Sequence, residues 1–218
     1  MKKSLCMVLV FFAAACGAFA QSGMIREMSG DVTLKPAGSA DFTAAKTGDA
    51  VAQDTVVSTG FKSTAVITIG SSTLTVRPLT RLSLAEIQSS SGTEKLNVEL
   101  QTGRVKVAVK PPAGTKANMT IQSPNATASV RGTSFEFDTV KLAVIEGEVA
   151  FGGDSGMVTM VQGGESSFVG ADGQPASPAA VASAALLPSA PVGTASANAS
   201  QPVPQSSTGN IDITIDWE

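Results

Sequence analysis

The sequence predicts an all-β protein with a layered architecture: a β roll or sandwich, or a short solenoid-like fold. In the body from Met24 to Gly170, apolar residues recur at every second position in many short runs, which is typical of half-buried strands. Glycines and small polar residues separate these runs at short intervals. No stretch of the body shows the 3.6-residue period of an amphipathic helix, so any helix there should be a single turn.

The first twenty residues are typical of a secretory signal peptide. Lys2 and Lys3 precede an apolar run, Leu5–Ala15, and Ala18-Phe19-Ala20 matches a cleavage site. The apolar run is too short for a confident membrane span. We therefore expect processing after Ala20 and a periplasmic or secreted chain that begins at Gln21.

A competing interpretation of this leader involves Cys16. The segment Ala13-Ala14-Ala15-Cys16-Gly17 resembles a lipoprotein processing box, in which the cysteine is lipidated and becomes the first residue. Lipidation would place the protein at a membrane surface of the envelope. Ala13 stands where such boxes usually have leucine, so the sequence favours the soluble form.

The processed soluble chain has no cysteine, because Cys6 and Cys16 both precede the predicted cleavage site. Its stability must therefore come from strand pairing and core burial and not from disulfides. Loss of Lys2 and Lys3 leaves 13 basic and 18 acidic residues, a formal charge of −5. A mildly acidic chain without basic runs argues against nucleic acid as a partner.

The body begins with a strand pattern at Val32 and Leu34, after Gly30, and Pro111-Pro112 divides it into two halves. The alternating runs predict these further strands: Thr55–Ser58, Ser63–Ile69, Ser72–Val76, Arg81–Ile87, Glu94–Leu100, Arg104–Lys110, Asn118–Gln122, Thr127–Val130, Ser134–Thr139, Lys141–Ile145, Glu148–Phe151, Met157–Gln162 and Ser166–Val169.

A short motif recurs at irregular spacing and each time precedes an alternating strand. Its three copies are Ser29-Gly30-Asp31-Val32, Thr102-Gly103-Arg104-Val105 and Glu146-Gly147-Glu148-Val149. We expect the three glycines to turn the chain at equivalent corners of the layered structure.

The stretch Ser129–Phe137 (SVRGTSFEF) alternates on both sides of Gly132 and predicts one half-buried strand. Phe135 and Phe137 share its buried face, and a glycine inside a strand indicates a bulge or a close backbone approach. Arg131 could pair with a carboxylate on a neighbouring strand, and the candidates are Glu136, Glu146 and Glu148. A structural role for this motif is favoured over a ligand site.

The ordered set of motifs resembles the FecR domain over roughly residues 24–170. The segments that carry the resemblance are Gly48–Leu84, Leu100–Val109 (LQTGRVKVAV), VRGTSFEF after TIQSPNATAS, and LAVIEGEVAF. Ser123-Pro124-Asn125 and Gly70-Ser71-Ser72 depart mildly from the family pattern. The resemblance implies a cell-envelope setting and the family-motif residues Arg131, Gly132, Thr133, Phe135, Glu146 and Gly147.

Residues 171–209 predict a disordered linker. They contain six of the eleven prolines, Asp172 is their only charge, and the rest is largely Ala, Ser, Gly, Thr and Gln. Ala179–Leu187 could form a transient helical turn, bracketed by Pro178 and Pro188.

The last nine residues, Asn210–Glu218 (NIDITIDWE), predict an amphipathic strand at the end of this tether. Its apolar face holds Ile211, Ile213, Ile215 and Trp217. Two outcomes are open: the strand folds back onto its own sheet, or it adds to the sheet edge of a partner.

The available chemistry argues against an enzyme. Because the chain has no histidine or tyrosine and the processed form no cysteine, histidine triads, thiol nucleophiles and His/Cys metal sites are excluded. Carboxylates are present, but their spacing marks no catalytic pair, and solvated strand faces explain them better. We expect no cofactor and no metal.

These observations predict an exported, non-enzymatic binding module of the bacterial cell envelope, whose partner is an envelope protein or a polysaccharide. Membrane contact is expected only if Cys16 is lipidated. The alternative is a component of a FecR-type signalling system, since FecR couples an outer-membrane receptor to a cytoplasmic sigma factor. Only four residues, Met1-Lys2-Lys3 and Ser4, precede the apolar run, so we expect no direct contact with a sigma factor.

Overall fold

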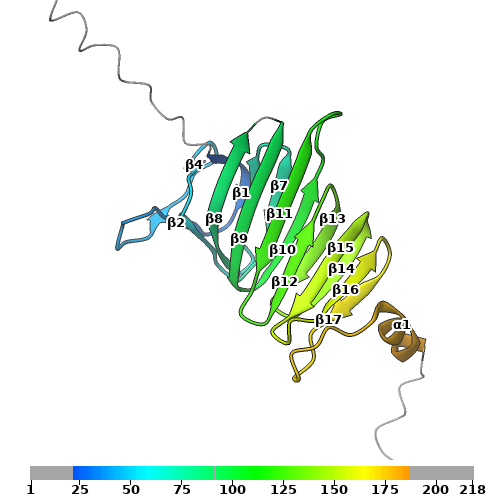
Figure 1. Ribbon diagram of the computed structural model, residues 1–218. Helices are drawn as coiled ribbons and strands as arrows, with labels where there is room; N and C mark the ends of the chain where they lie inside the picture. The colour runs from blue at the N-terminus through cyan, green and yellow to red at the C-terminus, as the bar shows by residue number, and fades with distance from the viewer. Residues whose placement is uncertain (1–21, 91, 187–218) are drawn as a thin grey trace, which may run out of the picture. The chain divides into compact units, whose positions relative to one another are not determined.

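The computed structural model describes residues 22–90 and 92–186, which form two β-sheets around a common core (Figure 1). In spatial order, the eight-stranded sheet A contains β17 (Ser166–Phe168), β14 (Lys141–Glu146), β13 (Ser134–Asp138), β10 (Arg104–Val109), β7 (Ser72–Val76), β6 (Thr64–Ile69), β1 (Gly23–Ser29) and β4 (Ala50–Val51). The nine-stranded sheet B contains β16 (Val158–Gln162), β15 (Glu148–Gly153), β12 (Ala126–Val130), β11 (Lys116–Gln122), β9 (Thr93–Thr102), β8 (Arg81–Ser90), β5 (Val56–Thr59), β2 (Val32–Lys35) and β3 (Thr43–Ala44).

The chain winds from one sheet to the other as it advances along the domain. After the β8–β9 hairpin of sheet B it crosses to β10 of sheet A and returns to sheet B as β11. One strand of sheet A therefore separates β9 from β11 in sequence, and these two strands pair in parallel, with Met119 opposite Leu96. The other strand pairs are antiparallel.

The core lies between the sheets and follows from the period-two pattern. Val105 and Val107 of β10 and Phe135 and Phe137 of β13 are fully buried, while the residues between them face outward. The ring of Phe137 in sheet A meets that of Phe151 in sheet B edge to face, at a centroid separation of 6.2 Å. Because each buried phenylalanine contributes about 2–3 kcal/mol, such contacts stabilise the pairing of the sheets.

The predicted all-β layered class is confirmed, and the strand runs from Thr55 to Val169 agree with the structure to within a few residues. The hairpin strands β8 and β9 are longer than predicted. Three strands near the N-terminus, β1, β3 and β4, were absent from the prediction, since β1 is largely exposed beyond Ile25 and the other two have two residues each.

The interpretation of Ser129–Phe137 as one strand with a glycine inside it is wrong, whereas the separate runs Thr127–Val130 and Ser134–Thr139 are confirmed to within one residue. β12 ends at Val130 in sheet B, β13 begins at Ser134 in sheet A, and Arg131-Gly132-Thr133 form the crossing between them. Gly132 has φ +71°, a left-handed conformation that disfavours other residues, so the glycine marks a corner and not a bulge.

The chain beyond Gly170 is more ordered than the linker predicted for residues 171–209. Val169 and Pro175 form a β-bridge, and helix α1 spans Pro178–Leu186. The hydroxyl of Ser177 accepts a hydrogen bond from the Ala180 amide at 3.3 Å, so Ser177 caps the helix and Pro178 begins it.

Several predicted features lie outside the described residues. These are the signal peptide with Cys16 and Ala20, the remainder of the linker, and the C-terminal strand Asn210–Glu218. Within residues 22–90 and 92–186, no helix is long and apolar enough to cross a membrane.

Candidate functional site

Three glycines turn the chain at corners between the two sheets, as the recurring motif predicts. Gly30, Gly103 and Gly147 have φ values of +76°, +90° and +89°, and each joins a strand of one sheet to a strand of the other. Only glycine adopts this conformation at little cost. The motif is therefore a structural device of the two-sheet winding.

A hydroxyl side chain lies against each of these glycines. Ser63 Oγ accepts a hydrogen bond from the Asp31 amide at 2.8 Å, beside Gly30. Thr80 Oγ1 accepts one from the Arg104 amide at 3.0 Å, beside Gly103.

Thr133 occupies the corresponding place beside Gly147, but its hydroxyl has no hydrogen-bond partner among the described residues. Thr133 is only 3% exposed. The threonine of the VRGT motif therefore fills a buried corner with its methyl group. Its hydroxyl accepts no backbone hydrogen bond of the kind that Ser63 and Thr80 accept at the other two corners.

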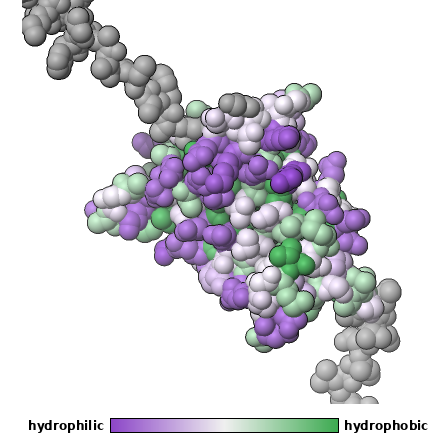
Figure 2. All heavy atoms as spheres, in the orientation of Figure 1, coloured by the Kyte–Doolittle hydropathy of each residue, from purple (hydrophilic) through white to green (hydrophobic). Residues whose placement is uncertain are grey.

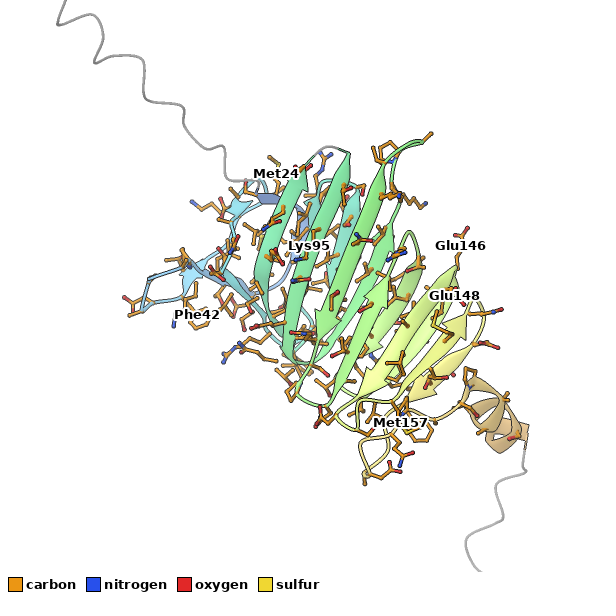
Figure 3. All side chains as sticks on the ribbon, viewed as in Figure 1. Met24, Phe42, Lys95, Glu146, Glu148 and Met157 are labelled. Atoms are coloured by element: carbon orange, nitrogen blue, oxygen red, sulfur yellow. The ribbon has the colours of Figure 1, made fainter. Side chains whose placement is uncertain are left out.

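The family-motif residues do not converge on one site. Phe135 is in the core, Gly132 lies on a crossing loop, and Gly147 lies at the next corner. Glu146 is exposed at the end of β14, and Figure 3 shows it and Glu148 at the same end of the domain. Thr133 and Gly147 pack against each other, but the motif residues as a set do not line one exposed site.

The ion pairs predicted for Arg131 are not present among the described residues. Glu136 pairs with Arg77 instead, and Glu146 and Glu148 form no salt bridge. Arg131 and Glu148 border a shallow hollow of about 490 Å³ on the outer face of sheet B, without a direct contact. Arg131 follows the last residue of β12 in sheet B, whereas Glu136 and Glu146 belong to strands of sheet A.

A larger cleft, of about 740 Å³, opens at the end of sheet A where β7, β10 and β13 meet their connecting loops. Its lining consists of two arginines, two carboxylates and several apolar or small residues: Arg77, Pro78, Leu79, Gly103, Arg104, Glu136, Asp138, Thr139 and Val140. The sheet order β13-β10-β7 brings these residues together from three separate parts of the chain.

The charges of the cleft form two ion pairs. Arg77 Nε lies 3.3 Å from Glu136 Oε1, and Arg104 Nη2 lies 3.5 Å from Asp138 Oδ2. Arg104 and Asp138 are direct cross-strand partners, so the register of β10 and β13 sets the second pair. All four side chains are partly exposed, so each pair adds little to stability and remains available to a ligand.

Asp138 also shapes the cleft wall. Its Oδ1 accepts hydrogen bonds from the amides of Val140 at 3.0 Å and Lys141 at 2.8 Å, which fixes the turn between β13 and β14. This turn holds Val140, 38% exposed, at the rim of the cleft.

Leu79 is the most unusual residue of the cleft. It is 59% exposed and has φ +55°, a left-handed conformation that costs about 1 kcal/mol or more for a residue with a β-carbon. Two contacts hold it there: the Leu79 amide donates to Gly60 O at 3.2 Å, and the Thr80 amide donates to Thr59 Oγ1 at 3.0 Å. An exposed apolar side chain in a strained, well-fixed loop is a candidate recognition element.

Phe61 is a further exposed apolar residue, in the loop whose Gly60 carbonyl bonds to Leu79. It is 73% exposed, and its neighbour Lys62 also has a positive φ of 55°. The sequence offered no signal for this cleft, because neither the conformation of Leu79 nor the pairing of β7 with β10 is visible in a local pattern. Exposed apolar side chains beside arginine and carboxylate groups suit a protein surface better than a reaction.

Among the described residues, no group of three His, Cys, Asp or Glu side chains could hold a metal ion. The two carboxylates of the cleft are each engaged by an arginine. The cleft can therefore offer a partner charged hydrogen-bonding groups and apolar contact.

Comparison with known proteins agrees with the motif analysis. Residues 55–150 match the family model described as FecR protein, which confirms the predicted resemblance. Two crystal structures of a candidate anti-sigma factor from Parabacteroides distasonis ATCC 8503 are similar at 16% sequence identity with a TM-score of 0.45. The similarity covers 56% of this chain and 57% of that protein, just over half of its length. None of the curated proteins compared with the chain matches it.

Proposed function

We propose, on the premise that residues 55–150 form a FecR domain, that this chain is a non-enzymatic protein-binding module of a FecR-type signalling system in the bacterial cell envelope. The observation that carries the proposal is the position of the cleft. All of its lining residues, from Arg77 to Val140, lie inside the matched segment. The recognition surface is thus part of the domain and not of an appendage.

The chemistry of the cleft supports a protein as the partner. Leu79 and Val140 supply apolar contact, and Arg77 and Arg104 supply the guanidinium groups that are enriched in protein interfaces. The partly exposed ion pairs can exchange their carboxylates for those of a partner with little loss of stability. A polysaccharide is the other partner class that the sequence analysis left open.

The family relation favours signalling over a general role in the envelope. FecR, to which the motifs are similar, couples an outer-membrane receptor to a sigma factor, and this chain carries the same domain. Export by the leader at residues 1–20 is part of the proposal and would place the cleft in the periplasm or outside the cell. Lipidation of Cys16 would instead hold the domain at a membrane surface.

Photo-crosslinking in cells of the native host would test the proposal. A photoreactive amino acid replaces Leu79 in the cleft, and in a second strain it replaces Ile145, which is similarly exposed at 54% but lies outside the cleft. We expect the Leu79 strain alone to give a discrete crosslinked protein, which mass spectrometry identifies as an envelope receptor or regulator. Equal crosslinking from both positions, or none from either, would contradict a protein-binding cleft.

Transcript profiling of a Leu79→Asp strain would separate signalling from simple binding. Aspartate tolerates the left-handed backbone better than leucine, so the domain should fold and accumulate normally. We expect altered transcription of a limited set of genes, and no change in an Ile145→Asp strain. A lost crosslink with unchanged transcription would support the more general envelope module and contradict the signalling role.

A further inference from the structure

At the C-terminal end of the domain, the two sheets are closed in different ways. In sheet A, the end strand β17 is covered by the returning chain: the Ala176 amide donates to Phe168 O at 2.8 Å, and Ser167 Oγ donates to Ala176 O at 2.6 Å. Helix α1 packs against the same strand. In sheet B, the end strand β16 has no such cover among the described residues.

The backbone of β16 presents free hydrogen-bonding groups at this edge. The Gly163 amide donates to Gly147 O at 2.8 Å, which fixes the register with β15. Because bonded pairs alternate along an antiparallel ladder, Thr159 and Val161 bond to β15, and Val158 and Met160 direct their N–H and C=O groups outward. The backbone N–H and C=O of Gln162 also point outward, but both are already bonded. The N–H donates to Glu165 Oε2, and the C=O accepts a hydrogen bond from the Glu165 backbone amide.

The side chains of this edge are apolar and exposed. Val158 is 65% exposed, Met160 49%, and neighbouring Met157 56%. Figure 2 shows green where Figure 1 places β15 and β16, against the purple area over β8 and β9. The edge strands at the other end, β3 and β4, have only two residues each, a common protection against unwanted pairing, and β16 carries neither this nor a lysine or proline.

We propose that the occupant of this edge is the chain's own C-terminal segment, Ile211–Trp217, added to β16 as a further strand of sheet B. The segment alternates apolar and polar residues, and its apolar face would continue the row formed by Val158 and Met160. A register one residue away would place its aspartates beside these side chains, so the pattern selects one phase.

The position and length of the intervening chain support an intramolecular strand. The described chain ends at Leu186 in α1, which packs on β17 at the same end of the domain as β16 (Figure 1). The 24 residues from 187 to 210 have a typical reach of roughly 25–30 Å, several times the spacing of about 10 Å between packed sheets. The edge therefore lies within reach of the tail, at a high effective concentration.

Trp217 is the only tryptophan of the chain and reports the docking by its fluorescence. The test compares the full processed chain with Met160→Pro, which removes an N–H that does not take part in the β15 ladder. The control, Met160→Ala, shortens the side chain and keeps the N–H. We expect blue-shifted emission in the unmodified chain, a red shift to that of exposed indole in Met160→Pro, and a smaller change in Met160→Ala.

A disulfide experiment tests the contact without relying on the proline variant. The processed chain lacks cysteine, so Met160→Cys combined with Ile213→Cys introduces a single possible bridge. We expect oxidation to a bridged monomer. Thr214→Cys, combined with Met160→Cys, should not bridge, because the proposed strand would place this side chain on its opposite face.

Three outcomes would overturn the inference. Emission of exposed indole in the unmodified chain would mean that the tail is not docked. Blue-shifted emission that persists in a folded Met160→Pro protein would place Trp217 elsewhere. A disulfide that forms only between two chains would assign the edge to a second copy. None of these results bears on the cleft of sheet A, so the proposed function stands or fails separately.

Discussion

Gly147 lies so close to Thr133 that a β-carbon at Gly147 would be 2.6 Å from Thr133 Cγ2 and 3.3 Å from the Thr133 α-carbon. Thr133 is 3% exposed and cannot withdraw without disturbing the corner. This contact joins two pieces of the sequence motif, V-R-G-T and E-G-E-V, which lie at successive corners of the winding chain. The packing of Thr133 against Gly147 therefore explains why both pieces occur in one sequence motif.

The first prediction measures that contact. Gly147→Ala should lower the free energy of unfolding by about 2–4 kcal/mol, because it adds a clash to the strain of φ +89°. The control is Gly164→Ala, at φ +85° with no atom within 4 Å, which should cost only about 1–2 kcal/mol. Urea unfolding of both variants gives the difference, and equal losses would refute the contact.

The second prediction concerns Gly132, whose added β-carbon would meet only Pro111 at 3.6 Å. Because space is available, backbone strain alone should count, and Gly132→Val should destabilise the fold by about 1–3 kcal/mol. Thermal melts provide the measurement. An unchanged melting temperature would show that the glycine is kept for another reason and would strengthen a ligand role for the loop Arg131–Thr133.

The third prediction separates the hydroxyls of two corner threonines. Thr133→Val should leave stability unchanged or raise it by about 1 kcal/mol, since the buried Thr133 hydroxyl has no partner among the described residues. Thr80→Val should lower stability by about 1–3 kcal/mol, because it removes the oxygen that accepts a hydrogen bond from the Arg104 amide. Chemical unfolding of the two isosteric variants checks this, and a loss at Thr133 as large as that at Thr80 would reveal a hydrogen bond there.

The fourth prediction addresses Leu79. Leu79→Asn should raise the free energy of unfolding by about 0.5–1 kcal/mol, since asparagine tolerates φ +55° and the leucine side chain is mostly exposed. The same change should weaken binding of the crosslinked partner at least tenfold, as expected for an apolar anchor. Calorimetry and a binding titration give the two values, and reduced stability would mean that Leu79 is part of the packing.

The fifth prediction concerns Asp138, which bonds two backbone amides and pairs with Arg104. Asp138→Ala should destabilise the domain by about 1–2 kcal/mol through loss of the turn bonds. Asp138→Asn keeps an oxygen acceptor and removes only the partly exposed ion pair, so it should cost less than about 1 kcal/mol. Similar melting temperatures for the two variants would contradict the capping role.

The strand pattern was predictable wherever turn residues enclose an alternating run. β7 was predicted at its observed limits, Ser72–Val76, because Gly70 and Pro78 lie close on either side. Hydrophobic alternation also placed Phe135 and Phe137 on the buried face. These are local properties, which a single sequence carries in full.

The sequence carries a signal for the break at Gly132. Ala126, Ala128 and Val130 are buried at even positions, whereas Thr133, Phe135 and Phe137 are buried at odd ones. A change of phase within a period-two run requires an extra residue or a change of sheet. Here it marks the crossing from sheet B to sheet A.

The cleft could not be predicted from local patterns. Arg77, Arg104 and Asp138 meet because β7 and β13 flank β10, an order that depends on the whole winding path. The helix at Pro178–Leu186 was predicted only as a transient turn over Ala179–Leu187, since proline was interpreted as a boundary although Ser177 and Pro178 form a good helix start.

The winding also bears on the order in which the protein can fold. Among the residues that the structure describes, partner strands lie near one another along the chain, and the most distant paired residues, Met24 and Thr68, are 44 positions apart. A chain that emerges N-terminus first can therefore complete each layer soon after its strands appear, without waiting for the last residues. The folded part would grow from β1 towards β17, and each new strand would pair with the free edge of the strands that have already folded. Truncation from the C-terminus should then remove layers one at a time and not abolish the fold at once.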